Sequence, residues 1–527
     1  MRLAIPLALA VLTVGLPTAA EATGTRTSTE SRPAEAQATR TAQLAAGSTA
    51  ATARAVEARD VIRWHGCQVG AGDEVGKELD RAGAQCGEVA VPLDYRRPQG
   101  RTITVAMSRL PATDGARRIG AMVLNDGGPG GPSLGMPVRL RAAMKEVGGR
   151  YDLIGMDPRF VGRSTPLDCE WSVGTWLMSA GSSRRSFNGG VAFAADLARR
   201  CTTKAGDLLP YVTTRNTARD MDRIRVALGE EKISYLGYSY GSYLGSVYLQ
   251  MFPGRADRVV LDGPMDPDLF GPQWLRPAGP ANEAALRNWA EWAAARDAKY
   301  HLGTKAAEVM ARVAQIYEVA ARRGLKVGDY LLDDRSVPWL LFGVLGNDRE
   351  PARLMQTDLI TTLSRATSGP VEPSMDVARL LDFSFSDDMA AASSAQLAIT
   401  CGDRAAPRAV NTYWQDIRAH RKSEPFFGGL IHNVSPCAFW PNQPQEAPTQ
   451  VRNATPALLV AADGDPRTTY PQALNLHRLL SGSRLVTVQN AQAHGMFGEY
   501  GNECADHHVI DYLATGVLPA TDQICTA

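Results

Sequence analysis

The stretch "GYSYGSYLG", residues 237–245, places Ser239 between Gly237 and Gly241, with a tyrosine on each side of the serine. The apolar segment "KISYL" leads into it, and "SVYLQMFP", which continues a helical pattern, follows. A strand, a sharp turn that carries the serine, and a helix are the context that a nucleophile elbow requires. The glycines fit this interpretation because the backbone of such a tight turn crowds its neighbours. Ser239 is therefore the candidate nucleophile.

Short apolar runs bounded by Gly, Pro, Asp or Asn recur on both sides of this stretch. "AMVL" precedes "NDGGPGG", "RVVL" precedes "DGP", and "PALLVAA" precedes "DGDPRTTY". Helical patterns lie between several of them, as in "TARDMDRIRVALGEE". Continuous apolar strands that alternate with helices predict an α/β protein whose mostly parallel sheet has helices on both faces. In "EVAVPLDY" and "TITVAMSRL" apolar and polar residues alternate instead, which predicts an antiparallel pair of strands at the start of the sheet.

The chain of 527 residues is too long for one compact core without an insertion or a second domain. Residues 267–450 read as mainly helical, as in "NEAALRNWAEWAAARDAKY", and strands return after them. We therefore expect a core built from residues 61–266 and 451–527. A helical cap, residues 267–450, is expected between the sixth and seventh strands of the sheet.

The N-terminus begins with Arg2 and an apolar run over residues 3–15, followed by the A-x-A signal Ala20-Glu21-Ala22. This pattern predicts a signal peptide over residues 1–22 and therefore a secreted, extracellular protein. Residues 23–60 hold almost no large apolar side chains, which predicts a disordered pro-segment or arm. No later run approaches 18 apolar residues, so we expect no membrane span in the mature protein.

An even number of cysteines in an exported chain predicts disulfides. Closure of the shortest loops favours sequential pairing, although the sequence leaves 105 connectivities open. Zinc is the alternative, but the chain lacks C-x-x-C and a matching histidine pair, so we expect no metal site. The eight cysteines, in the order that sequential pairing would join them, are Cys67, Cys86, Cys169, Cys201, Cys401, Cys437, Cys504 and Cys525.

The charge of the chain is balanced, with 56 Lys and Arg against 55 Asp and Glu. Proteins that hold nucleic acid present a basic field to the phosphates. No such field or local basic run is visible, so we expect no nucleic-acid partner.

A serine needs a base to take its proton, and in strand–turn–helix enzymes the chain order is Ser, acid, His. His494, in "AQAHGMF", is the histidine that sits in a loop directly after a late strand. The acid should follow the preceding strand, where "DGDPRTTY" offers Asp463 and Asp465, and we favour Asp465 because a few loop residues are needed to reach the imidazole. Asp262, after "RVVL", remains a third choice.

An oxyanion also needs N–H donors. The amide of Tyr240, directly after the nucleophile, is one candidate. The other should come from the glycine-rich "NDGGPGG", where we favour Gly128 over its neighbours Gly130 and Gly131.

These motifs resemble the tripeptidyl aminopeptidases secreted by actinomycetes, which are related to proline iminopeptidases and share the α/β-hydrolase fold. "NDGGPGGPS", "YDLIGMDPRFVGRS", "ISYLGYSYGSYLG", "DGDPRTTY" and "AHGMF" carry the resemblance, which extends over roughly residues 60–527. It implies Ser239 as nucleophile, Asp465 as acid and His494 as base. Two positions depart from the family pattern: Asn125-Asp126 before the glycines, and Phe160 where that family has a glycine. Both are expected near the site mouth, where they would affect substrate preference.

The resemblance implies a serine exopeptidase that releases short peptides, tripeptides in that family, from free N-termini through an acyl-enzyme, without metal or cofactor. Such an enzyme must recognise an ammonium group, and Glu283 in "PANEAALRNW" is the candidate residue from the cap. A carboxylesterase or lipase-like enzyme on the same scaffold is the alternative, because fold and triad leave the acyl group open. A binding module is a third interpretation, which the complete triad disfavours. We expect a monomer with peptides as its partners.

Overall fold

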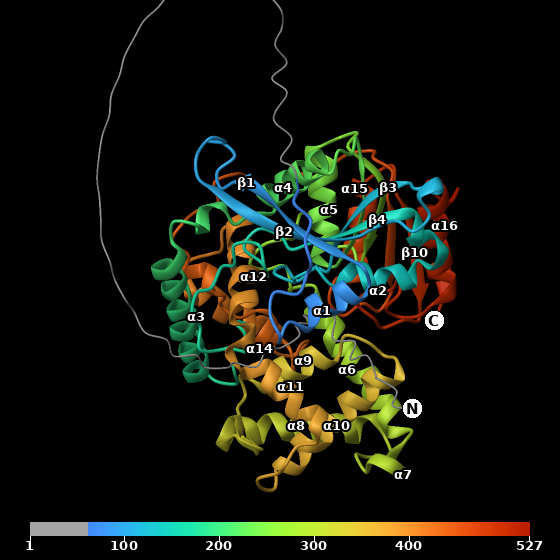
Figure 1. Ribbon diagram of the computed structural model, residues 1–527. Coiled ribbons are helices and arrows are strands. Elements are labelled where there is room, and N and C mark those ends of the chain that lie inside the picture. Colours follow the sequence, from blue (N-terminus) through green and yellow to red (C-terminus); the bar gives the residue numbers. More distant parts are fainter. Residues whose placement is uncertain (1–61) are drawn as a thin grey trace, which may run out of the picture.

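The computed structural model describes residues 62–527, apart from the side chain of Asp388 (Figure 1). The signal peptide predicted over residues 1–22 and the arm predicted over residues 23–60 lie outside the described residues. The folded body is built around one large sheet, with a helical cap beside it.

The sheet has nine strands in the order β1-β2-β4-β3-β5-β6-β9-β10-β11. β1 pairs with β2 and β2 pairs with β4 in antiparallel fashion, and all the other neighbours are parallel. The predicted opening antiparallel pair is confirmed, with Val89 opposite Val105. The strands are β1 (Gln85–Pro92), β2 (Thr102–Leu110), β3 (Gly120–Asn125), β4 (Tyr151–Met156), β5 (Ile233–Tyr238), β6 (Ala256–Asp262), β9 (Leu458–Ala462), β10 (Arg484–Gln489) and β11 (Gln523–Thr526).

Helices cover both faces of this sheet, as predicted for strands that are apolar throughout. In β3, Ala121 and Val123 join one hydrophobic core, while Met122 and Leu124 join the other. α4 and α5 pack in the first core, and α2 and α16 pack in the second. The helices of the core are α1 (Glu74–Arg81), α2 (Met136–Ala143), α3 (Arg184–Ala205), α4 (Thr214–Ala227), α5 (Tyr240–Met251), α15 (Tyr470–Leu479) and α16 (Glu503–Thr515).

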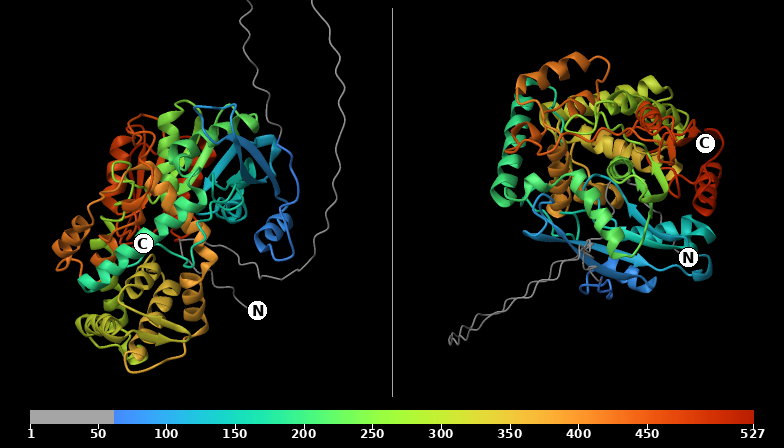
Figure 2. Two further views of the ribbon diagram at one scale, coloured as in Figure 1. Left: turned by 90° about the vertical axis from the view of Figure 1, so that its left-hand side faces the viewer. Right: turned by 90° about the horizontal axis from the view of Figure 1, so that it is seen from above.

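The predicted cap between the sixth and seventh strands of the sheet is confirmed. Figures 1 and 2 show its yellow helices α8, α10 and α11 as a lobe to one side of the sheet. It includes a small hairpin, β7 (Leu325–Val327) with β8 (Tyr330–Leu332). Its helices are α6 (Ala278–Ala294), α7 (Asp297–Tyr300), α8 (Ala306–Arg323), α9 (Val337–Val344), α10 (Glu350–Ala366), α11 (Met375–Phe385), α12 (Ala390–Asp403), α13 (Val410–His420) and α14 (Gly428–Ile431).

One part of the first core segment lies against this cap, which the sequence did not predict. Helix α3 contacts the short 3-10 helix Pro436–Phe439. The loop before α3 places Gly174, Thr175 and Leu177 in a cavity that cap residues also line. Segments on both sides of the elbow in sequence therefore build the same wall.

Four disulfides join the cysteines in sequential order: Cys67–Cys86, Cys169–Cys201, Cys401–Cys437 and Cys504–Cys525. This is the pairing that loop closure favoured, and it leaves no cysteine free. No helix within residues 62–527 has the length and apolar character that crossing a membrane would take.

The disulfides make a direct prediction for the purified protein. Thiol titration of the denatured, unreduced chain should detect no free thiol, because all eight cysteines are paired. The double variant Cys401→Ser/Cys437→Ser should lose about 3–4 kcal/mol of unfolding free energy, because it opens a loop of 36 residues. Thermal unfolding compares it with the wild type. Two or more thiols per wild-type chain would contradict the pairing.

Candidate active site

Ser239 occupies the sharp turn between β5 and α5. Its backbone has φ 55° and ψ −120°, a conformation that L-residues other than glycine rarely adopt. β5 ends at Tyr238 and α5 begins at Tyr240, so the serine is the single residue between strand and helix. The Ser239 amide donates to the Asp262 carbonyl at 2.8 Å, which ties the turn to β6. This strand–turn–helix geometry is the one that a nucleophile elbow requires.

The two flanking glycines are required by close backbone contacts. A Cβ on Gly237 would lie 2.6 Å from the Gly241 carbonyl oxygen, and a Cβ on Gly241 would lie 2.9 Å from the Asn125 carbonyl oxygen. Real Cβ atoms essentially never approach other atoms within 3.0 Å. Any larger residue at either position would therefore push the strand, the helix or the β3 loop away from the serine.

His494 and Asp465 form a hydrogen-bonded pair beside the elbow. The imidazole Nδ1 lies 2.9 Å from Asp465 Oδ2 and 3.2 Å from Oδ1, and both side chains are buried. The Asp465 carboxylate also accepts from the Thr468 hydroxyl at 2.9 Å and from the Arg467 amide at 2.7 Å. These donors hold the carboxylate in place, and the carboxylate in turn holds the imidazole in one orientation.

The two other carboxylates that the sequence left open have different partners. Asp463 is exposed and accepts from the Asn490 amide at 3.1 Å. Asp262 is fully buried and accepts from the amides of Met496 and Phe497, just after His494, the shortest of these bonds being 2.7 Å. Burial raises the pKa of Asp262 to about 8. Asp262 thus fixes the loop that carries His494, whereas Asp465 holds the ring itself.

The His494 loop is also joined to the cap. The His494 amide donates to the Gly346 carbonyl at 2.9 Å, and Ala493 forms a β-bridge with Asn347. Asp348 accepts from the Gln492 amide at 3.2 Å and from the Tyr500 hydroxyl at 3.0 Å. The segment that follows α9 is therefore hydrogen-bonded to this loop along several residues.

The glycine-rich loop after β3 packs against the elbow. Gly127 has φ 96°, and a Cβ on it would lie 2.5 Å from the Tyr238 carbonyl oxygen and 3.1 Å from Ser239 Cβ. Gly128 has φ 105°, and Gly127, Gly128 and Gly131 all line the cavity that contains Ser239. The Tyr240 amide lies in the first turn of α5, directly beneath the serine.

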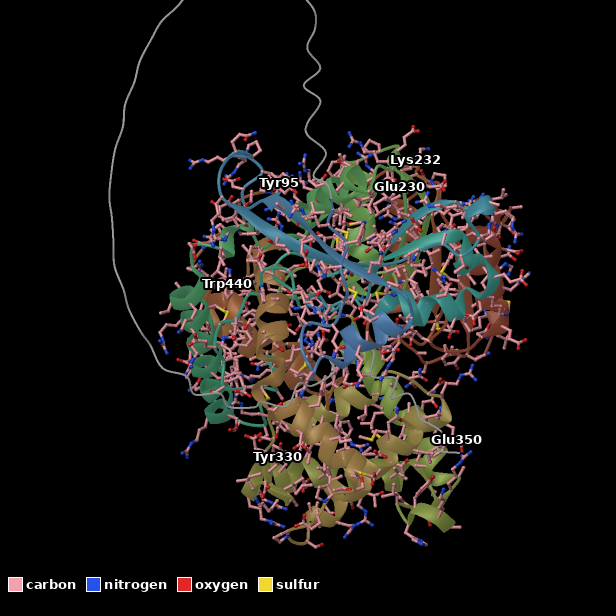
Figure 3. All side chains as sticks on the ribbon, in the orientation of Figure 1. Tyr95, Glu230, Lys232, Tyr330, Glu350 and Trp440 are labelled. Atoms are coloured by element: carbon pink, nitrogen blue, oxygen red, sulfur yellow. A yellow bond between two sulfur atoms is a disulfide. The ribbon has the colours of Figure 1, made fainter. Side chains whose placement is uncertain are left out.

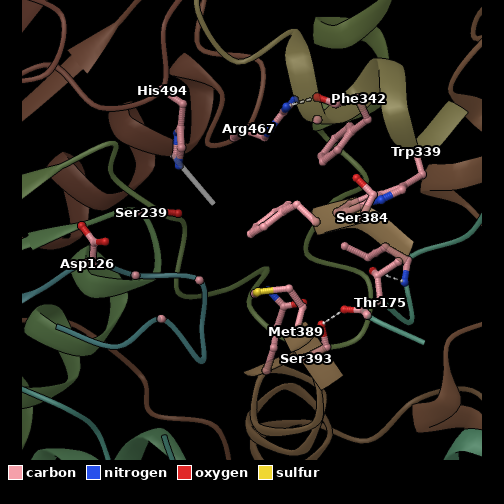
Figure 4. A pocket seen from close by; sticks show the side chains of 18 of the residues that line it. Asp126, Thr175, Ser239, Trp339, Phe342, Ser384, Met389, Ser393, Arg467 and His494 are labelled. Carbon is pink, nitrogen blue, oxygen red and sulfur yellow. Dashed lines mark hydrogen bonds between the residues drawn. The ribbon is translucent and has the colours of Figure 1, made fainter. Parts of the chain in front are cut away.

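Ser239 and His494 open into one cavity, called here the chamber, and Figure 4 shows both at one end of it. Across from them lie Trp339, Ser384, Met389 and Thr175. The cap side of the chamber is mostly apolar. It is formed by Trp274, Leu275, Trp339, Leu340, Phe342, Leu380, Phe383 and Met389.

The acidic side chains that line the chamber are Asp126 and Glu499, at the Ser239 end. Arg139 binds both of them, with Nη2 at 2.5 Å from Asp126 Oδ1 and Nη1 at 2.5 Å from Glu499 Oε1. Burial raises the pKa of Glu499. The sequence singled out Asp126 as a departure from the family pattern, but it did not predict its partners, which lie 13 and 373 residues further along the chain.

The prediction that Glu283 projects from the cap toward the substrate is wrong for this structure. Glu283 is 1% exposed and is not among the residues that line the chamber. Its Oε1 accepts from the amides of Phe426 at 2.8 Å and Phe427 at 3.0 Å, and burial raises its pKa. The carboxylate therefore holds together two segments of the cap.

Phe160 also lies elsewhere than expected. It is 1% exposed in the hydrophobic core and does not line the chamber, so it does not sit at the site mouth. Its φ of 68° shows that the backbone keeps the left-handed conformation that a glycine would favour.

Comparison with known proteins places this chain in a family. A family model described as TAP-like protein matches residues 424–525. The tripeptidyl aminopeptidase of Streptomyces lividans is 33% identical over 506 residues, which cover 90% of this chain and 88% of that protein. The serine protease Hip1 of Mycobacterium tuberculosis (strain H37Rv) is 30% identical, over 84% of this chain and 87% of that protein. Carboxylesterase B of the same strain is 28% identical, over 84% and 86%.

The fold, the elbow and these relatives define a serine hydrolase of the α/β-hydrolase class. Within that class the chain belongs to the tripeptidyl aminopeptidase family.

The buried Asp262 carboxyl predicts how stability depends on pH. Its pKa of about 8 in the folded state lies above that of an exposed aspartate, so between about pH 4 and pH 8 the folded chain binds a proton that the unfolded chain does not. Unfolding free energy should therefore fall as pH rises through this window, by up to about 1.4 kcal/mol per pH unit from this group. Asp262→Asn should make that fall shallower, whereas the exposed Asp463→Asn should not. Thermal unfolding across the window measures both, and equal slopes in all three proteins would contradict the assignment.

Proposed function

We propose that this protein is an exported serine exopeptidase that removes tripeptides from free N-termini through a Ser239-His494-Asp465 triad. The observation that carries the proposal is the buried Asp465–His494 pair, because His494 lines the same cap-covered chamber as the strained Ser239. The names of the relatives support peptide chemistry, and the disulfides fit an oxidising compartment.

In the proposed mechanism His494 accepts the Ser239 hydroxyl proton while Oγ attacks the scissile carbonyl carbon. Asp465 orients the imidazole and stabilises the imidazolium that forms. The amides of Gly128 and Tyr240 are proposed to stabilise the oxyanion. His494 then gives its proton to the leaving amine, and an acyl-enzyme remains. Water, deprotonated by His494, releases the peptide acid and restores Ser239.

Cleavage near the N-terminus follows from the shape of the chamber. The acyl part of the substrate must lie under the cap, where Trp339, Ser384 and Thr175 face Ser239 across the cavity. An extended tripeptide spans about 10 Å, so a wall across the cavity limits how many residues precede the scissile bond. The mainly apolar cap wall favours apolar side chains on this part of the substrate. We propose a monomer in solution that needs no metal, cofactor, nucleic acid or membrane.

An esterase is the second candidate, and one observation favours it. The cap wall holds no carboxylate among the described residues that line the chamber, because Glu283 points elsewhere. An apolar wall suits an uncharged acyl group, and Carboxylesterase B is among the relatives. Substrate preference separates the two functions.

The triad is tested by three variants. Ser239→Ala and Asp465→Asn should each lower kcat by about 10⁴-fold, because the triad acts as a unit and the acid sets the tautomer of the base. Asp463→Asn should retain activity within a few-fold, because Asp463 binds the Asn490 amide rather than the imidazole. Steady-state kinetics on one tripeptide amide measure all three. A larger loss at Asp463 than at Asp465 would overturn the assignment of the acid.

The exopeptidase proposal is tested by a matched substrate panel. A tripeptide arylamide with a free amine should be cleaved at least about 30-fold faster, in kcat/KM, than its N-acetyl counterpart, because the wall across the cavity limits the length of the acyl part. The acetyl group removes the ammonium charge and lengthens the acyl part under the cap. A tetrapeptide arylamide and a short acyl ester complete the panel. Equal rates with and without acetyl, together with fast ester hydrolysis, would favour the esterase instead.

A further inference from the structure

The Ser239 end of the chamber carries a charged group of three residues, Asp126, Arg139 and Glu499, called here the mouth cluster. Arg139 donates one hydrogen bond to each carboxylate. The other oxygens, Asp126 Oδ2 and Glu499 Oε2, have no hydrogen-bond donor within residues 62–527. The two acidic side chains are 22% and 23% exposed. The cluster has a formal charge of −1 and acceptor atoms that a ligand can reach.

The position of the cluster relative to His494 decides which part of a substrate it meets. A Cβ on Gly495, the residue after the base, would lie 3.8 Å from Glu499 Cγ and 3.8 Å from the Tyr238 ring. Because the imidazole must hand its proton to the leaving amine, the leaving group lies on the His494 side of the scissile bond. Glu499 is therefore on the path of the residues that follow that bond.

The cluster is too close to the nucleophile to bind the ammonium of a tripeptide. Asp126 adjoins Gly127, on which a Cβ would lie 3.1 Å from Ser239 Cβ. The amine of an extended tripeptide lies about 10 Å from the carbonyl carbon that Ser239 attacks. The free N-terminus of the substrate therefore lies under the cap. The mouth cluster then faces the residues that follow the scissile bond.

We propose that Asp126, Arg139 and Glu499 form the subsite for the first residue of the leaving peptide and select a cationic side chain there. The inference rests on the proposed exopeptidase function. A lysine or arginine at this position can reach the two unshared carboxylate oxygens, whereas an acidic side chain meets a net negative charge. Arg139, held between both carboxylates, fixes their spacing and is already paired.

The test uses internally quenched peptides that share their first three residues and differ only in the fourth. With Lys, Gln or Glu at that position, wild-type kcat/KM should fall in that order, with about a fivefold step between Lys and Gln, the size of a partly exposed charge pair. Asp126→Asn and Glu499→Gln should each reduce the ratio of Lys to Glu. Mass spectrometry of the products identifies the bond that is cut.

Glu230→Gln is the matched control. Glu230 forms an ion pair with Arg118, as Glu499 does with Arg139, but it lies outside the chamber. Figure 3 labels it at the end of the molecule away from Tyr330 and Glu350 of the cap. This variant should keep the wild-type ratio of Lys to Glu.

A second measurement needs no variant. A dipeptide that begins with lysine should inhibit the wild type more strongly than one that begins with glutamate, because the first resembles the favoured leaving product. Equal inhibition, equal rates for Lys, Gln and Glu, or a preference for Glu would overturn the inference. Asp126→Asn could instead reduce the difference in kcat/KM between free and acetylated substrates while the ratio of kcat/KM for Lys to that for Glu stays unchanged. That result would assign the mouth cluster to the substrate ammonium. If the tripeptide is released at equal rates from the peptides with Lys, Gln and Glu, the inference fails and the proposed function stands. Cleavage of esters alone would overturn both the inference and the proposed function.

Discussion

The backbone of Ser239 is the constraint on which the site depends. Its positive φ costs of the order of 1–2 kcal/mol for a residue with a Cβ. The turn persists because β5 before it and α5 after it are buried, and because its amide binds β6. As a result, the Ser239 hydroxyl projects away from both elements at the edge of the sheet. The glycines at 237, 241 and 127 follow from this one requirement, since each lies where a side chain would separate the pieces around the serine.

The parallel sheet places the other two residues of the proposed triad at the same edge. β9 and β10 are neighbours in the sheet, and Asp465 and His494 lie in the loops that follow them, 29 residues apart in sequence. This arrangement could be predicted, because an apolar strand and the loop after it are both visible in the sequence and because parallel strands end at a common edge. The predicted sheet, cap, elbow and acid–base pair all rest on such local signals.

Side-chain direction could not be predicted in the same way. Glu283 lies on a helix of the cap, as expected, but which face of α6 meets the chamber depends on how the cap packs, and its carboxylate turns to two backbone amides instead. Phe160 was expected at the site mouth because the family that the sequence resembles has a glycine there, yet its side chain is buried in the core. The mouth cluster joins Asp126, Arg139 and Glu499 from three separate segments, and no local sequence pattern predicts contacts of this kind.

Arg467 joins the cap to the loop that carries Asp465. Its guanidinium binds Asn282 of α6 at 2.7 Å and the Phe342 carbonyl of α9, while its own amide holds Asp465. The cap and the loop that carries Asp465 are thus parts of one rigid assembly. A movement of the cap away from the sheet would therefore displace the Asp465 carboxylate as well. In the proposed mechanism the leaving peptide departs first and the tripeptide acid departs last, which is the ordered release of a ping-pong enzyme.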